Sequence, residues 1–466
     1  MSSSNTTIAS LEAAIAQTHT DMDTLWVLVC TMMVFLMQTG FSFLEAGSVR
    51  STSVVNILTK NLLGTCMVTI AWWILGYGLA FGDDTTSGTR NGFIGNADFV
   101  TAWSSYKSWH IWVFEWAFVA DTTTILSGAI SERTTTHGYL IYAAIFAGWI
   151  YPVVAHWFWS TSGWLSPLKK DIEGPGSLGV IDFAGCAVVH LLGGVASLCG
   201  AVIMGPRKGR WVKKNENYFK PHNIPFQFLG TLLLFLGWFG FNPGSTTAIS
   251  NGMSIVAAKA TVNTVLAAAS AGLTGAFIRL CIPKFLVWDA GNLQNCVLAG
   301  LVAVTAGCAT VEPWGAVCIG IIAAPIYIGL SFLLRKLKID DPLDAVPVHG
   351  GCGLWGLIAA GIFSSPRGVS AAYNVVSTGS LFWGNGEQFG MQFLGAVVVI
   401  AWGAAWCIPL FIIMRFIPRG FGFRISEKQE KAGIDVALHD VDGTNIGSLT
   451  LSPFSISNAK IDKSTT

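Results

Sequence analysis

Long apolar runs divide this sequence almost from end to end, and they constrain its fold more than any other feature. Eleven of them are each long enough, at about 20 residues, to cross a bilayer as a helix. They lie near residues 25–47, 57–82, 109–131, 138–159, 180–204, 226–249, 254–282, 291–310, 313–335, 345–364 and 391–416. Pro152 interrupts the fourth run and Lys259 lies near the start of the seventh, so these two are the weakest candidates. The pattern predicts an all-α polytopic membrane protein with eleven transmembrane helices.

Composition supports a membrane protein, because only 11% of the residues are charged, against roughly 25% in an average soluble domain. The net charge of +1 gives no reason to expect a nucleic-acid partner. The ten cysteines lie almost all inside apolar runs, and none forms a CxxC pair. We expect buried free thiols, no zinc site, no disulfide framework and no cofactor.

Basic residues predict the orientation of the chain in the membrane. They cluster after the fifth, ninth and eleventh runs, at Arg207, Lys208, Arg210, Lys213, Lys214, Lys220, Arg335, Lys336, Lys338, Arg419, Arg424, Lys428 and Lys431. Eleven spans place all three clusters on one side, and the positive-inside rule makes that side cytoplasmic. Lys169 and Lys170 depart mildly from this pattern.

Three regions follow from this topology. Residues 1–24 form an extracellular N-terminal tail, residues 25–418 the transmembrane domain, and residues 419–466 a cytoplasmic C-terminal tail. The first region has no Lys or Arg and no continuous apolar stretch, so we expect the first span to direct insertion rather than a signal peptide. Asn5 begins a glycosylation sequon that is usable only if this tail is extracellular.

Two stretches place ionisable residues inside apolar runs, where they are costly and often mark a pathway. One runs from Asp182 to His190 and the other from Asp341 through Asp344 to His349, and glycines follow each histidine. The two stretches would be equivalent if helices one to five and six to ten form two repeats, a common transporter design. Their histidines are therefore candidate pore residues, with side-chain packing as the alternative. For Asp182, at the start of its helix, a structural cap is the simpler interpretation.

Aromatic residues gather near the predicted outer ends of three runs. Phe114 and Phe118 share one helix face, Trp159 ends the fourth run, and Trp238 and Phe241 precede Ser245 at the end of the sixth. An interfacial belt explains such residues in general. Aromatic faces with one hydroxyl are also what a small cation needs when it sheds water.

Several motifs together closely resemble the ammonium transporter (Amt/Mep/Rh) family, in its ammonium-transporter branch. They comprise Gln38 to Arg50, Gly128 to Arg133, Tyr151 to Trp159, Asp182 to His190, Gly237 to Ser245 and Asp340 to Gly353. The resemblance extends from about residue 25 to residue 435. It implies eleven helices in a 5+5 inverted repeat, a homotrimer in the plasma membrane, and one pore per subunit.

The resemblance also implies roles for individual residues. Phe118, Trp159 and Ser245, with Phe114 beside them, would form an outer cation site, and Phe118 and Phe241 a stacked gate. His190 and His349 would line a twin-histidine pore, while Asp182, Asp344 and Trp238 would act structurally or electrostatically. The chain is then expected to be a transporter rather than an enzyme, with ammonium, ammonia and methylammonium as candidate substrates.

The physical chemistry of ammonium agrees with these roles. Ammonium donates four hydrogen bonds, which a serine oxygen and aromatic faces can partly satisfy. A dry pore disfavours the intact ion and favours deprotonation, whereas potassium has no proton to lose. Neutral imidazoles can hold ammonia and relay a proton. The resemblance to the plant branch suggests that this proton crosses too.

Three alternatives and one departure remain. A rhesus-type channel for ammonia or carbon dioxide has less use for Trp159 and Ser245. An ammonium sensor usually carries a larger signalling domain, and a metalloenzyme would need a third close ligand. Where plant relatives carry a phosphorylated threonine in the tail, this chain has Ala437, so that off-switch is in doubt.

Overall fold

The computed structural model describes residues 2–82, 91–100, 108–169, 179–281, 288–417 and 422–439, with side chains from residue 7 onward. Within these ranges the chain is helical and contains no β-strand. The longer helical elements, in chain order, are α1 (Ser2–Ser48), α2 (Val54–Ala71), η2 (Trp72–Gly76), α3 (Tyr77–Phe81), α4 (Trp109–Ala129), α5 (Thr136–Ile145), η3 (Phe146–Ile150), α6 (Tyr151–Trp159), η4 (Cys186–Leu191), α7 (Leu192–Met204), α8 (Ile224–Gly244), α9 (Met253–Cys281), α10 (Ala290–Val304), α11 (Pro313–Lys336), η7 (Val346–Gly351), α12 (Cys352–Phe363), α13 (Pro366–Tyr373), α14 (Gly386–Phe416), α15 (Glu427–Ala432) and α16 (Ile434–Leu438).

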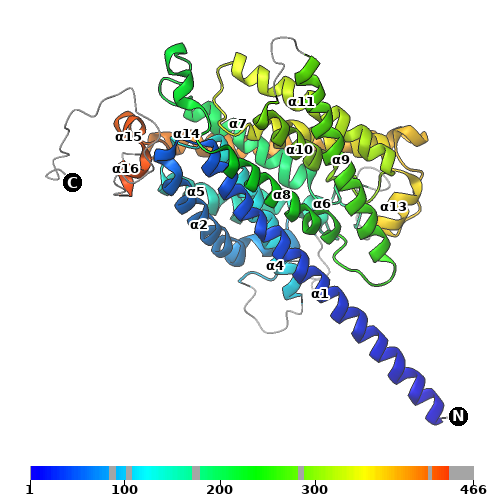
Figure 1. Ribbon diagram of the computed structural model, residues 1–466. Coiled ribbons are helices and arrows are strands. Elements are labelled where there is room, and N and C mark those ends of the chain that lie inside the picture. The colour runs from blue at the N-terminus through cyan, green and yellow to red at the C-terminus, as the bar shows by residue number, and fades with distance from the viewer. Residues whose placement is uncertain are drawn as a thin grey trace.

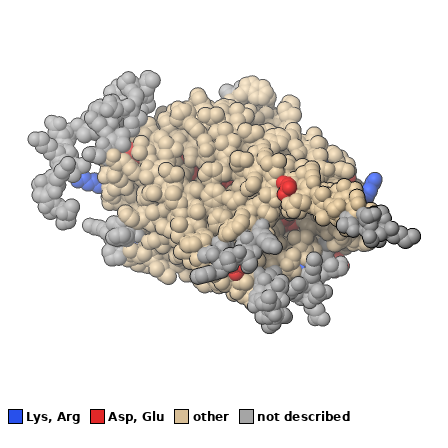
Figure 2. Space-filling model, turned by 90° about the horizontal axis from the view of Figure 1, so that it is seen from below, with Lys and Arg blue, Asp and Glu red and all other residues tan. Residues whose placement is uncertain are grey.

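These elements form a bundle of eleven spans, as the apolar runs predict (Figure 1). Among the described residues, nine helical segments are long and apolar enough to cross a membrane. The other two spans are α4, which carries Glu115 and Asp121, and the shorter α10. Over the face shown in Figure 2, few charged side chains interrupt the uncharged surface, as expected where lipid surrounds the protein.

Both of the doubtful runs are spans. Pro152 lies in the first turn of α6, directly after the π-helical turn η3, so the backbone changes its hydrogen-bond pattern where proline removes a donor. Lys259 lies in the first turns of α9, and its Nζ is 3.1 Å from Glu312 Oε1 in a half-exposed ion pair. Neither residue therefore breaks its membrane segment.

Two predicted runs are helical over only part of their length. The chain at residues 179–185 is non-helical before η4 begins, and residues 305–310 form turns after α10 ends. These irregular segments bond to each other, since Phe183 N–H donates to the Ala306 carbonyl at 3.0 Å and Ala184 N–H to the Thr305 carbonyl at 3.2 Å. Non-helical backbone at membrane depth is tolerated when protein satisfies it in this way.

The N-terminal region is helical. The first span and residues 2–24 form one continuous helix, α1, whose N-terminal end projects beyond the bundle (Figure 1). The C-terminal helices α15 and α16 lie at the opposite end of the molecule. We call these two ends the N-face and the C-face.

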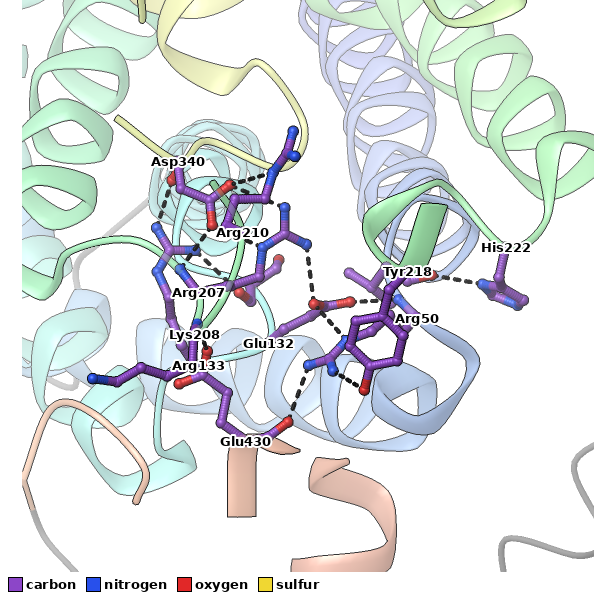
Figure 3. A network of polar contacts seen from close by, with 12 residues as sticks. Arg50, Glu132, Arg133, Arg207, Lys208, Arg210, Tyr218, His222, Asp340 and Glu430 are labelled. Atoms are coloured by element: carbon purple, nitrogen blue, oxygen red, sulfur yellow. Dashed lines mark hydrogen bonds and ion pairs between the residues drawn. The ribbon is translucent and has the colours of Figure 1, made fainter. Parts of the chain in front are cut away.

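A buried polar network joins the connections at the C-face (Figure 3). Glu132 Oε2 accepts from Arg50 at 2.9 Å and from Arg207 at 3.0 Å, and Arg207 also forms a two-point ion pair with Asp340 at 2.8 and 3.0 Å. The Glu430 carboxylate in α15 accepts a hydrogen bond from the Arg424 guanidinium at 2.8 Å. The network therefore connects the ends of α1, α4 and α7 to the segment before η7 and to the C-terminal helices.

The helix α16 attaches directly to the start of a membrane span. Asp435 is fully buried, and its two carboxylate oxygens accept from Val55 N–H at 2.9 Å and Asn56 N–H at 2.8 Å. A carboxylate at a helix N-terminus satisfies free amides and interacts favourably with the helix dipole. Residues 422–439 are therefore part of the folded C-face. Ala437 lies in α16 and is part of this docked segment.

Candidate functional site

Aromatic side chains converge at the N-face end of the bundle. The rings of Phe114 and Phe118 in α4 are 4.8 Å apart between centroids, and Phe118 meets Trp159 edge-on at 5.8 Å. The Trp159 indole N–H donates to the Asp182 carbonyl at 2.8 Å, which fixes the ring at the end of α6. Ser245 follows α8, and its hydroxyl donates to the Phe241 carbonyl at 2.8 Å. Both Trp159 and Ser245 are partly exposed, whereas Phe114 and Phe118 are buried.

Phe118 and Phe241 form a closed aromatic pair one layer further in. Their rings stack at 4.2 Å with an interplanar angle of 27°, and both are almost fully buried. Since 4.2 Å is close to ring contact, no molecule can lie between these rings in this conformation.

Two histidines continue the column beneath this pair. His190 stacks against Phe241 at 5.6 Å and against Trp238 at 5.7 Å. The Nδ1 atoms of His190 and His349 are 3.1 Å apart, a hydrogen bond in which one imidazole donates and the other accepts. His190 Nε2 is buried with no bonding partner among the described residues. The pair thus requires one specific tautomer on each ring and leaves Nε2 available to a ligand.

Each histidine lies in a π-helical turn, His190 in η4 and His349 in η7. Such turns are rare and frequent at functional sites. Glycines let the two segments meet, because a Cβ on Gly194 would lie 2.2 Å from the Gly350 Cα, and one on Gly353 would lie 3.1 Å from the His190 Cβ. The glycines after each histidine therefore allow the close packing that their positions predict.

A carboxylate precedes each histidine by the same distance in sequence. Asp182 Oδ2 accepts from Ala187 N–H at 2.9 Å and Val188 N–H at 3.0 Å, at the helix start where its sequence position predicts a cap. Asp341 Oδ2 accepts from Val346 N–H at 2.7 Å, the fifth residue after it, as Ala187 is the fifth after Asp182. Asp341 is therefore the counterpart of Asp182. The sequence stretch that begins at Asp341 was matched to the one that begins at Asp182, but the role was assigned to Asp344, although Asp182 and Asp341 each precede their histidine by eight positions.

Asp344 belongs to the same sequence motif as His349, but its side chain lies apart from the histidine pair. Its Oδ2 accepts from Tyr327 at 3.0 Å and Ser331 at 2.9 Å, both on α11, and lies 3.4 Å from Arg335. Its backbone has φ of 57°, which ends the turn before η7. Trp238 contacts His190 directly, and its indole N–H donates to Thr305 at 3.3 Å.

A small cavity of about 20 Å³ lies on the C-face side of His349. Its polar lining comes from His349, Thr124, Asn295 and Glu45, and Phe41 adds an aromatic wall. Phe41 lies 6.2 Å from the His349 ring. This volume exceeds the 10–15 Å³ or so that one water-sized molecule needs.

Comparison with known proteins places these features in context. A family model described as the Ammonium Transporter Family matches residues 25–444. Ammonium transporter 1 member 3 of Solanum lycopersicum is 39% identical over 450 residues, covering 92% of this chain and 94% of the relative. Ammonium transporter Amt2 of Archaeoglobus fulgidus is 38% identical, covering 90% and 87%.

Solved structures agree with the sequence comparisons. A structure titled Sensor Amt Protein matches with a TM-score of 0.78 and 32% identity, covering 91% of this chain and 99% of that one. Saccharomyces cerevisiae Mep2 matches with a TM-score of 0.76 and 28% identity, covering 87% of each chain. The similarity extends over the whole bundle that carries the aromatic column and the histidine pair.

Proposed function

The chain belongs to the ammonium transporter family, and from this premise we propose that it deprotonates ammonium at the N-face and conducts ammonia past the histidine pair. The observation that supports this most is the buried column formed by Phe118, Phe241 and His190, which continues to His349. An apolar constriction followed by two hydrogen-bonding imidazoles suits a small neutral molecule that can accept and donate hydrogen bonds.

The entry step uses the partly exposed groups at the N-face. Ammonium binds among Phe114, Phe118 and Trp159 by cation–π attraction and donates a hydrogen bond to Ser245, whose oxygen keeps its lone pairs while its own hydrogen bonds Phe241. Below these residues the path is buried, so an intact ion loses its hydration without replacement. When a ring swings aside, transfer of one proton to the unpartnered His190 Nε2 breaks one N–H bond of the ion and removes this cost, and neutral ammonia then continues along the path.

The released proton follows through the histidines. Since one Nδ1 donates to the other, a proton arriving at one ring allows the shared hydrogen to shift and a proton to leave from the second ring. Net transport then carries one positive charge per ammonium. Potassium cannot take this route, because it has no proton to give up.

The protein is a membrane protein, and we propose the plasma membrane as its location, with the C-face in the cytoplasm. The basic residues near the C-face, among them Arg207, Lys208 and Arg210 (Figure 3), support this orientation by the positive-inside rule. Residues 440–466 lie outside the described structure. We also propose a homotrimer with one pore per subunit, on the basis of the family resemblance.

Uptake of labelled methylammonium into cells lacking their own ammonium transporters tests the proposal. Expression of this chain should produce saturable uptake that unlabelled ammonium competes away and potassium does not. Uptake equal to that of cells with an empty vector would contradict it.

Sensing is the second candidate, because one solved relative is titled a sensor. A sensor would bind ammonium without moving it. Saturable binding to purified protein, combined with no uptake in the same cells, would favour that function over transport.

A further inference from the structure

A buried carboxylate on the C-face side of the histidine pair has no role in the mechanism above. Glu45 is 1% exposed, and it lines the same cavity of about 20 Å³ as His349. Its two oxygens differ in their surroundings. Oε2 accepts from the Ser127 hydroxyl at 2.6 Å, whereas Oε1 has no hydrogen-bond partner among the described residues. A buried oxygen without a donor is costly, so its retention beside a cavity points to a ligand.

The charge around Glu45 is balanced by one lysine. Lys60 Nζ lies 4.0 Å from Oε2, donates to the Ser127 carbonyl at 3.3 Å, and lies 5.0 Å from the centre of the Tyr139 ring. The lysine therefore approaches the side of the carboxylate that faces Ser127. Asn61 also interacts with this carboxylate, but Oε1 has no partner in hydrogen-bonding geometry, so Oε1 is the acceptor available to a molecule in the cavity.

The remaining lining suits a small cationic donor. Phe41 supplies an aromatic face, and Thr124 donates its hydroxyl hydrogen elsewhere, to the Ala120 carbonyl at 2.9 Å or the Gln38 side chain at 3.0 Å. Its oxygen can therefore accept. An aromatic ring, a hydroxyl oxygen and a carboxylate oxygen can together satisfy several N–H donors.

We propose that this cavity is an inner ammonium site, in which ammonia regains its proton next to His349 and Glu45 Oε1 accepts one of the resulting N–H groups. The N–H bond of the protonated imidazole breaks and a fourth N–H bond forms on ammonia, so the positive charge moves from the ring to the substrate. This inference rests on the proposed function, because it needs both ammonia and a relayed proton at His349.

The test measures charge and substrate separately in proteoliposomes that hold the purified full-length protein. Ammonium-evoked current reports charge, and the change in internal pH under an ammonia gradient reports neutral flux. Glu45→Gln keeps size and shape and removes the negative charge. We expect the ratio of current to flux to fall about 10- to 100-fold, the factor expected for one charge-assisted hydrogen bond.

Glu115→Gln is the matched control. Glu115 is also buried, and its Oε2 also lacks a partner among the described residues, but it does not line the cavity. The Glu115→Gln variant should keep the wild-type ratio of current to flux. Because Glu45→Gln leaves Lys60 without its counter-charge, the double variant Glu45→Gln, Lys60→Met is measured as well, and it should show the same low ratio.

The outcomes separate this inference from the proposed function. If the wild-type protein gives no current, the proposed proton route is wrong, and the inner site is wrong with it. Wild-type current together with an unchanged ratio in a folded Glu45→Gln protein, or in the folded double variant, overturns the inner site alone. An equal fall in the Glu115→Gln control also overturns it, since the effect would then not depend on the cavity.

Discussion

His190 and His349 share one hydrogen between their Nδ1 atoms, and each ring is almost fully surrounded by protein. A charged imidazole at this depth lacks the solvation that water provides, so both rings rest in the neutral form. Their neutrality fits the proposed relay better than a fixed cation site. Two predictions follow at the scale of single residues.

Replacing both histidines with alanine should abolish ammonium-evoked current. The double variant keeps an apolar path but has no group that can pass a proton between the two faces. His190→Asp or His349→Glu alone should keep conduction and admit potassium, because a fixed carboxylate attracts a bare cation. Currents recorded in ammonium and in potassium solutions check both results. Full current with unchanged selectivity in the double variant would show that the two histidines serve only in side-chain packing.

Changes at the N-face mouth should alter affinity more than capacity. A cation–π contact or one hydroxyl hydrogen bond contributes about 0.5–2 kcal/mol, so Trp159→Leu or Ser245→Ala should raise the half-saturating concentration roughly 2- to 30-fold. The maximal uptake rate should fall less. Concentration-dependent methylammonium uptake measures both quantities. Identical curves for both variants and the wild type would place the cation site elsewhere.

Among the helical elements, the contact between α7 and η7 positions the two histidines. It depends on backbone meeting backbone, since a Cβ on Gly194 would lie 2.2 Å from the Gly350 Cα, well inside van der Waals contact. A Cβ on Gly350 is easier to accommodate, because it would lie 3.4 Å from the nearest atom. The two glycines are therefore not equivalent.

Gly194→Ala should destabilise the protein by about 1–3 kcal/mol, the usual cost of overpacking, and should reduce transport by separating the rings. Gly350→Ala is the matched control and should retain most of the stability and most of the transport of the wild type. Thermal unfolding in detergent and methylammonium uptake give the two readouts. Equal effects of the two substitutions would show that this contact does not position the histidines.

The same elements explain what sequence could and could not predict. Hydropathy located all eleven spans, because each must be apolar to cross the bilayer. The shared order of aspartate, apolar stretch, histidine and glycines identified His190 and His349 as a pair. Hydropathy did not reveal the π-turns, since they change hydrogen bonding without changing composition. The role of Asp341 was assigned to Asp344, because Asp344 stands in the same motif and lies nearer the histidine in sequence. The helix over residues 2–24 had a weak signal in Ile8, Leu11 and Ile15, which recur at helical spacing.

On the scale of the whole molecule, the C-face network holds distant parts of the chain together. Burial opposes ionisation of Asp340, but Arg207 outweighs it and lowers the pKa of this carboxyl. Burial likewise opposes ionisation of Glu132, and Arg50 and Arg207 outweigh it, so the pKa of Glu132 is also lowered. Both groups therefore stabilise the fold in their charged forms.

Their depressed pKa values set the sign of a pH effect. The stabilisation is complete above about pH 4, near the unfolded pKa values, and is lost as pH falls through the lower folded values. Asp340→Asn should lower the free energy of unfolding at pH 7 by about 3–5 kcal/mol, because Arg207 is left buried without its main partner. The variant should also lose less stability than the wild type on acidification.

Melting temperatures at pH 7 and at about pH 2, which is below the unfolded pKa values, measure this difference. Lys431→Ala is the control, since it removes an exposed pair with Glu427 at 2.8 Å, which contributes little. If Asp340→Asn had the same melting temperatures as the wild type at both pH values, the network would not stabilise the fold.

The stacked rings of Phe118 and Phe241 imply a particular kind of throughput. With 4.2 Å between centroids, the proposed path is shut at this level except when a ring swings aside, and both rings are enclosed by protein. Each passage then waits for a thermally activated rotation that its neighbours must accommodate. The flux should saturate with concentration and rise steeply with temperature, as an enzyme's turnover does, rather than increase in proportion to the gradient as it would through an open hole.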